Sequence, residues 1–168
     1  AEIAEVEPEF FTTTFANYEI IADENEKVFI YENHINHNIK TDRTLLKQLM
    51  TILFDNAVKY TEEDGIIKFI VWSKDRSLYL RVSDNGPGIN NEDKKKIFDR
   101  FYRVDKARTR QKGGFGLGLS LAKQIADALK GTITVKDNRP KGTIFEVKIS
   151  IKSESKKRVG RLSDGKKD

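Results

Sequence analysis

The chain has 168 residues, of which 38% are hydrophobic and 34% charged, a composition typical of a globular protein with a single core. No apolar run approaches the roughly 20 residues of a membrane-spanning helix, and no signal peptide is visible. Because there is no cysteine, disulfides and thiolate metal sites are excluded.

The net charge of +5 is unevenly distributed along the chain. Residues 100–112 contain six Lys/Arg against one Asp, and residues 152–168 contain seven against three Asp/Glu, so the remainder has a net charge of −4. Since the positive charge lies in one loop and one tail, and no recognition motif is present, the sequence does not favour nucleic-acid binding.

Periodicity and turn signals predict the elements in chain order. In the first half, we expect a frayed acidic segment at 1–7 and then a short helix from Pro8 to about Tyr18. Strands are expected at Glu19–Ala22 and Val28–Tyr31. A long helix over about 43–60 should follow, with Asp42 as its N-cap. In the second half, we expect paired strands at Ile66–Trp72 and Leu78–Ser83, followed by a short helix over about 92–99. A further helix should run from near Gly116 to Leu129, with Gly131 as its C-cap. The last element is expected to be a hairpin of two strands, Thr132–Lys136 and Thr143–Ile151.

This order of helices and strands predicts an α/β sandwich, in which a mixed sheet of about five strands carries helices packed on one face. We expect residues 1–18 to be a lead-in with a short helix, residues 19–151 to form the main domain, and residues 152–168 to be a basic disordered tail.

Six of the eleven glycines fall in two clusters, Asp84-Asn85-Gly86-Pro87-Gly88 and Gly113-Gly114-Phe115-Gly116-Leu117-Gly118-Leu119. Glycine lets the backbone approach a ligand closely, and a glycine loop that leads into a helix presents N–H donors to an anion. The clusters therefore predict a site for a phosphorylated ligand. The second cluster lacks the preceding strand of a dinucleotide fingerprint and the Gly-Lys-Ser/Thr of a P-loop, so it indicates neither.

On the first long helix, Asn56, Lys59 and Tyr60 are spaced to share one face, offset from the leucine stripe. An Asn amide oxygen suits Mg²⁺, a Lys suits phosphate, and a Tyr ring can stack on or cover a flat base. The alternative is an ordinary amphipathic helix with a polar outer face.

The first glycine cluster follows a strand, so Asp84 lies at a strand end. Its carboxylate can accept a hydrogen bond from an exocyclic amine such as adenine N6, and Gly86 and Gly88 let the chain turn beneath a base. The alternative is a plain Asp-Asn-Gly turn.

Between the clusters lies Ile97-Phe98-Asp99-Arg100-Phe101-Tyr102-Arg103. Aromatic residues beside a basic, glycine-rich stretch indicate a mobile lid over about 90–115, anchored by the aromatics and contacting phosphate through arginine. The alternative is a solvated basic loop with buried phenylalanines.

The order Asn-Ala-x-Lys-Tyr, Asp-x-Gly-x-Gly, Phe-x-x-Phe-Tyr-Arg and Gly-x-Gly-x-Gly-Leu resembles the ATP-binding catalytic domain of bacterial sensor histidine kinases. That domain belongs to the superfamily shared with DNA gyrase, the ninety-kilodalton heat-shock chaperone and the MutL repair proteins. The resemblance covers about residues 35–150. It implies a Bergerat-type ATP-binding fold, ATP and Mg²⁺ as cofactors, and transfer of the γ-phosphoryl group to a histidine.

The resemblance also implies partners: a histidine-bearing dimerisation domain of the same kinase, and a response regulator downstream. The chain itself is expected to be a cytoplasmic monomer that belongs to a bacterial integral-membrane receptor. Two further readings remain open, a protein serine kinase of the anti-sigma-factor type and a non-catalytic nucleotide-sensing interaction module.

By resemblance, each motif position takes a role. Asn56 would bind Mg²⁺, Lys59 would contact phosphate, Tyr60 would lie near adenine and Asp84 would accept from adenine N6. The other implied ATP-binding positions are Gly86 and Gly88 in the base pocket, Phe98, Phe101, Tyr102 and Arg103 in the lid, Gly114, Gly116, Leu117, Gly118 and Leu119 in the phosphate loop, and Thr143 near the base. No residue is assigned as a general base.

Two departures from the family stand out. Ile52 occupies the position, one turn before Asn56, where family kinases often have a second Asn and the superfamily's ATPases a Glu that activates water. Asp55 lies about 100° around the helix from Asn56 and is a poor substitute, so we expect very slow ATP hydrolysis. The only histidines, His34 and His37, lack the sequence context of a phosphoacceptor, and in a strand-like segment they would point to opposite faces.

Overall fold

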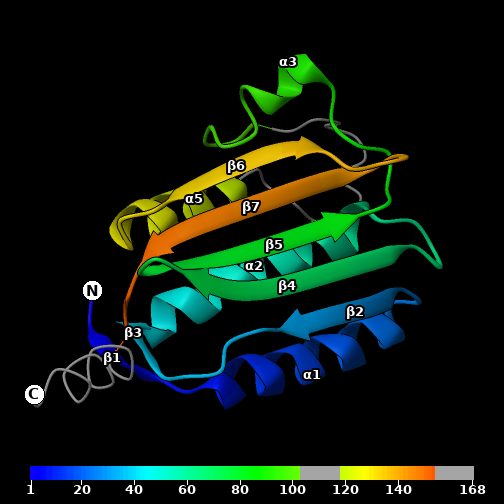
Figure 1. Ribbon diagram of the computed structural model, residues 1–168. Coiled ribbons are helices and arrows are strands. Elements are labelled where there is room, and N and C mark those ends of the chain that lie inside the picture. The colour runs from blue at the N-terminus through cyan, green and yellow to red at the C-terminus, as the bar shows by residue number, and fades with distance from the viewer. Residues whose placement is uncertain (103–117, 154–168) are drawn as a thin grey trace, which may run out of the picture.

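The computed structural model describes residues 1–102 and 118–153, and its centre is a five-stranded mixed sheet with the order β2-β4-β5-β7-β6. The strands are β2 (Val28–Asn33), β4 (Ile66–Lys74), β5 (Ser77–Asp84), β6 (Thr132–Asp137) and β7 (Thr143–Ser150). β2 and β4 are parallel, and the other neighbours are antiparallel. Helices α1 (Pro8–Glu24), α2 (Arg43–Tyr60) and α5 (Gly118–Ala128) cover one face, which confirms the predicted fold class (Figure 1).

The strands form because their apolar residues alternate, so that one face of the sheet is buried against the helices. In β5 the alternation is regular, with Leu78, Leu80 and Val82 buried. The opposite face carries polar and aromatic side chains. There Trp72 and Tyr79, which are cross-strand partners, stack with ring centroids 5.2 Å apart.

Helix α2 agrees with its prediction at both ends. The side chain of Asp42 accepts a hydrogen bond from the backbone N–H of Leu45 at 3.0 Å, which lowers the pKa of Asp42 and fixes the first turn. Along the helix, the residues at helical spacing are buried: Leu46, Leu49, Met50, Leu53, Phe54 and Ala57. This packing orients the remaining face of α2, which carries the predicted ligand-binding residues.

The predicted strand Glu19–Ala22 is wrong, because these residues belong to α1, which continues to Glu24. The physical reason is a set of aromatic side chains that bury one face of the helix. Tyr18 stacks on Phe54 of α2 with a centroid distance of 4.3 Å, and Phe15 lies 5.0 Å from Phe69 of β4. The expected boundary between residues 18 and 19 therefore falls inside α1, and the buried residues of α1 belong to the same hydrophobic core as those of the sheet and α2.

A second, three-stranded sheet with the order β1-β3-β8 lies at one end of the molecule (Figure 1). It consists of β1 (Ile3–Val6), β3 (Ile39–Asp42) and β8 (Lys152–Ser153). Residues 3–6 are therefore paired, not frayed, because β1 pairs with β3 and buries Val6. The first two residues of the expected disordered tail form β8, and residues 154–168 lie outside the described part of the chain.

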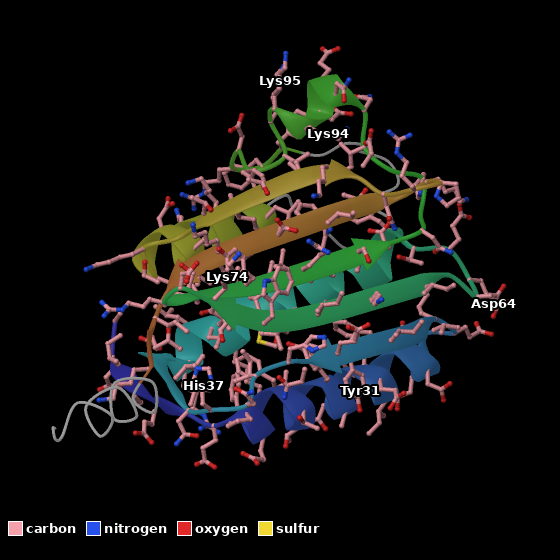
Figure 2. The ribbon with its side chains drawn as sticks, in the orientation of Figure 1. Tyr31, His37, Asp64, Lys74, Lys94 and Lys95 are labelled. Atoms are coloured by element: carbon pink, nitrogen blue, oxygen red, sulfur yellow. The ribbon has the colours of Figure 1, made fainter. Side chains whose placement is uncertain are left out.

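The first part of the predicted lid follows β5. Its helix α3 (Asn91–Lys94) is shorter than the expected 92–99 and begins at Asn90, whose side chain accepts from the N–H of Asp93 at 2.8 Å. Lys94, labelled at the top of Figure 2, forms a 2.6 Å ion pair with Asp137 at the end of β6. The segment around α3 is thus tied to the β6–β7 hairpin. Among the described helices, none has the length and apolar character needed to cross a membrane.

Candidate functional site

The predicted base-binding carboxylate, Asp84, lies at the end of β5 and is only 7% exposed. Its Oδ1 accepts hydrogen bonds from the backbone N–H groups of Gly86 at 2.9 Å and Thr143 at 3.3 Å. Burial raises the pKa of Asp84, and these two N–H donors partly offset that effect. The carboxylate is therefore held in one orientation, and no described residue donates a hydrogen bond to its Oδ2.

The turn after Asp84 is packed so closely that three glycines are required. A Cβ on Gly86 would lie 2.6 Å from the carbonyl oxygen of Tyr60, and one on Gly142 would lie 1.9 Å from the carbonyl oxygen of Asp84. Gly88 and Gly142 also have positive φ angles of 80° and 112°. The end of β5 is thus enclosed between the C-terminus of α2 and the β6–β7 loop. Sequence reasoning assigned no role to Gly142; the only signal was its position directly before Thr143.

One face of α2 extends from the Asp84 turn to the start of α5. This face carries three residues spaced one helical turn apart: Ile52, Asn56 and Tyr60. A Cβ on Gly118, the first residue of α5, would lie 3.8 Å from Cγ2 of Ile52, whereas the Tyr60 carbonyl lies against Gly86. With a rise of 1.5 Å per residue, Asn56 lies about 6 Å along the helix from each neighbour. Asn56 therefore lies between the α5 helix start and the Asp84 turn, as a site that binds phosphates and base together requires.

The side chains available on α2 fit a metal ion that is held mainly by a ligand's phosphates. Asn56 is half-buried, and within residues 1–102 and 118–153 its side-chain amide has no hydrogen-bond partner. The same part of the chain contains no cluster of three or more His, Cys, Asp or Glu that could hold a metal. Mg²⁺ is commonly bound by one or two protein oxygens, several waters and substrate phosphates, so the neutral oxygen of Asn56 suits it.

The charged neighbours of Asn56 point away from the core. Lys59 is exposed, and its positive charge lowers the pKa of Asp55, which partial burial raises by a larger amount. Because Asp55 is offset by one residue from Asn56, the two side chains leave the helix in different directions. Lys59 is one turn from Asp55 and next to Tyr60, so a phosphate that approaches Asn56 lies within range of its ammonium group.

The lid residues have mixed environments. Phe98 packs edge-on against Phe145 of β7 with a centroid distance of 6.2 Å, and the Tyr102 hydroxyl donates a hydrogen bond to Asp93. Phe101 is 62% exposed, has a positive φ of 67°, and lies beside the guanidinium of Arg100. At the helix start, Leu119 packs against the core. Four predicted positions lie outside the described residues: Arg103, Gly114, Gly116 and Leu117.

The two histidines lie far from this site. His34 follows β2, where its N–H bonds to the carbonyl of Val71, and its Nε2 is 2.8 Å from Glu32 Oε1. Figure 2 shows His37 at the opposite end of the molecule from Asp64, which lies in the turn that leads into β4. Because Asp84 pairs with Ile67 at that start of β4, the histidines and Asp84 are at opposite ends of the sheet.

Comparisons with known proteins identify the family of this chain. Residues 41–153 match the family described as histidine kinase-, DNA gyrase B-, and HSP90-like ATPase. The chain is 75% identical over 157 residues to the sensor protein CiaH of Streptococcus pneumoniae, an alignment that covers 94% of this chain and 35% of that protein. The chain thus spans about a third of the length of this relative.

Solved structures with this fold include catalytic domains of histidine kinases. The nucleotide-free catalytic domain of the histidine kinase ThkA has 29% sequence identity and a TM-score of 0.76, covering 89% of this chain and 98% of that chain. A structure of ThkA in complex with the response regulator protein TrrA has 27% identity and a TM-score of 0.72, covering 88% of this chain and 41% of that chain. The likeness thus covers most of this chain, not only the matched motifs.

Proposed function

The chain belongs to the family of histidine kinase-, DNA gyrase B- and HSP90-like ATPases and has the fold of histidine kinase catalytic domains, and from this we propose how it acts. It binds ATP with Mg²⁺ and donates the γ-phosphoryl group to a histidine on a separate dimerisation domain. The observation that carries the proposal is the position of Asn56, between the start of α5 and the buried Asp84 turn.

The base is recognised at the Asp84 end of the site. Oδ2 of Asp84, to which no residue in the described part of the chain donates, accepts a hydrogen bond from the exocyclic amine of adenine, while Gly86 and Gly88 allow the ring to approach the backbone. A buried carboxylate that is already oriented by two N–H donors loses little conformational entropy on binding. Thr143, whose N–H donates to Oδ1 of the same carboxylate, would lie beside the bound base.

The phosphates lie toward Asn56, Lys59 and the start of α5. The N-terminus of α5 and the ammonium of Lys59 both favour negative charge. Mg²⁺, bound through the amide oxygen of Asn56, would supply charge neutralisation on the phosphates. Phosphoryl transfer depends mainly on positioning and on this kind of charge stabilisation, so the chain needs no general base of its own.

The partners follow from the same proposal. The acceptor histidine belongs to the dimerisation domain of the parent kinase, because His34 and His37 lie at the end of the sheet opposite Asp84. From that histidine, the phosphoryl group passes to an aspartate on a response regulator. We propose that this chain acts as a monomeric unit on the cytoplasmic side of a membrane receptor.

Radiolabelled ATP provides the test. The chain is incubated with [γ-³²P]ATP, Mg²⁺ and the dimerisation domain of its parent kinase, and the acid and alkali stability of the labelled product is measured. We expect an acid-labile, alkali-stable phosphohistidine on the dimerisation domain. Acid-stable phosphoserine on another protein would instead support the serine kinase reading. Binding of ATP with no transfer to any acceptor would support the nucleotide-sensing module.

A further inference from the structure

An asparagine outside the predicted site makes a direct contact with the base-binding residue. Asn138, in the loop between β6 and β7, donates a hydrogen bond from its side-chain Nδ2 to the main-chain carbonyl oxygen of Asp84 at 2.8 Å. The two residues are 54 positions apart in the chain. This bond therefore connects the β6–β7 hairpin to the strand end that carries the carboxylate.

The orientation of the Asn138 amide is fixed by its other bonds. Its side-chain Oδ1 accepts from the N–H of Arg139 at 2.9 Å, and its backbone N–H donates to the carbonyl of Gly142 at 3.0 Å. Because Oδ1 is occupied by a donor, Nδ2 is the atom that is directed at Asp84. The amide is thus a rigid connection and not a flexible surface contact.

From this arrangement we infer that Asn138 is a positioning residue for recognition of the nucleotide base, acting through Asp84; the inference rests on the proposed function. Asp84 is held at its main chain by Asn138 and at Oδ1 by Gly86 and Thr143. With the main chain and one carboxylate oxygen both fixed, the direction of Oδ2 is fixed too. A hydrogen bond to an amine weakens steeply when its geometry departs from linear, so a shift of the strand end weakens base recognition.

Discrimination between bases is the property that separates positioning from a purely structural role. If Asn138 only stabilised the hairpin, its loss would weaken all nucleotides equally. If it directs Oδ2, its loss selectively weakens nucleotides that carry the exocyclic amine. Adenosine and inosine triphosphates make the comparison, since inosine has a carbonyl oxygen in place of that amine and the two share their phosphates.

The substitution Asn138→Asp is the sharpest variant. An aspartate keeps the oxygen that accepts from Arg139 and the size of the side chain, but it has no donor for the Asp84 carbonyl. Asn138→Ser, which keeps a shorter donor, serves as the conservative variant. Asn33→Ala is the matched control, because Asn33 also donates to a main-chain carbonyl, that of Pro8 at 2.9 Å, at the far end of β2.

The experiment measures the ratio of the dissociation constants for ITP and ATP, with Mg²⁺, on the full chain by titration calorimetry. We expect Asn138→Asp to reduce this ratio by about three- to tenfold, the range expected for loss of one hydrogen bond. We expect a smaller reduction in Asn138→Ser and no change in Asn33→Ala. In an Asp84→Asn background, Asn138→Asp should change the ratio no further, because both act through one group.

The outcomes separate the inference from the function on which it rests. If Asp84→Asn lowers the ratio but the two Asn138 variants leave it unchanged, Asn138 is structural and the inference is wrong while the proposed function stands. If Asp84→Asn itself leaves the ratio unchanged, the proposed base recognition is wrong and the inference with it. If Asn138→Asp does not fold, as judged by circular dichroism, Asn138→Ser decides by the same ratio.

Discussion

At the scale of single residues, Asp84 combines the proposed role in base recognition with a cost to stability. Burial raises its pKa, so the folded protein binds a proton more tightly at this carboxyl than the unfolded chain does. Ionisation of Asp84 therefore destabilises the folded state, and this destabilisation grows as the pH rises through the ordinary aspartate range. A residue that lowers stability at neutral pH and is held by three protein groups is typical of a binding site.

The substitution Asp84→Asn tests this directly. We expect a higher melting temperature at pH 7, by about 2–4 °C if the gain is about 1 kcal/mol, and a loss of that gain as the pH falls through the raised pKa toward about 4. Thermal denaturation of both proteins at pH 3 and pH 7 measures it. If the variant is no more stable than the unsubstituted protein at pH 7, then the ionised Asp84 carboxylate does not destabilise the folded state and this interpretation is wrong.

Asn56 differs from Asp84 because its amide has no hydrogen-bond partner among the described residues. Asn56→Ala should leave the melting temperature nearly unchanged and weaken Mg²⁺-dependent ATP binding by about tenfold or more, since a metal ligand is lost. Gln48→Ala, an exposed amide two turns earlier on α2, is the control for binding. Equal affinity of both variants for ATP with Mg²⁺ would show that Asn56 is only a surface residue.

Asp55 is the acidic residue next to Asn56 on α2. It is offset around the helix from Asn56, and the residue one turn before Asn56 is the apolar Ile52, so among the described residues α2 places no carboxylate where it could activate water. We therefore expect steady-state ATP hydrolysis by the chain to be very slow, and Asp55→Asn not to change it. Fast turnover that Asp55→Asn abolishes, measured by phosphate release, would make the chain an ATPase.

The sequence was sufficient to select Asp84 and Asn56, because a strand end and a helix face are local patterns. Asn138 was not selected, since its contact with Asp84 joins segments 54 residues apart, and an Asn in a turn is ordinary. For Ile52, the sequence showed only that this residue departs from the Asn or Glu that the family and superfamily have at the same position. Its position against Gly118 gives a packing reason for an apolar residue there.

At the scale of elements, the β6–β7 loop is as important to the site as the helix that carries Asn56. Gly142→Ala should destabilise the protein by about 1–3 kcal/mol or more, because φ is positive at this position and a Cβ would overlap the Asp84 carbonyl. Gly118→Ala is a matched control, because a Cβ there would lie at an ordinary contact distance, 3.8 Å, from Cγ2 of Ile52, and we expect a change below about 1 kcal/mol. Urea denaturation measures both, and equal stabilities would contradict the close packing at Gly142.

Helix α1 shows why element boundaries were predicted less well than element types. Glu19–Ala22 contains the β-branched pair Ile20-Ile21, which favours a strand, yet stacking of Tyr18 on Phe54 extends the helix to Glu24. At the end of α5, the left-handed position is Lys130 and not the expected Gly131. Gly131 is required for another reason, since a Cβ there would lie 2.1 Å from the carbonyl oxygen of Lys148.

At the scale of the whole molecule, the mixed sheet and its covering helices followed from the order of the predicted elements. The small sheet did not, because β1, β3 and β8 are short and pair residues from both ends of the chain. This small sheet lies at the end of the molecule away from the C-terminal end of β5, where Asp84 is, so the candidate site lies at the opposite edge (Figure 1).

A crystal structure of the chain with Mg²⁺ and a non-hydrolysable ATP analogue tests the central claim most directly. The account predicts the adenine amine within hydrogen-bond distance of Asp84 Oδ2, the metal beside Asn56, and the phosphates toward the start of α5. A nucleotide bound elsewhere, or with its base away from Asp84, would contradict it.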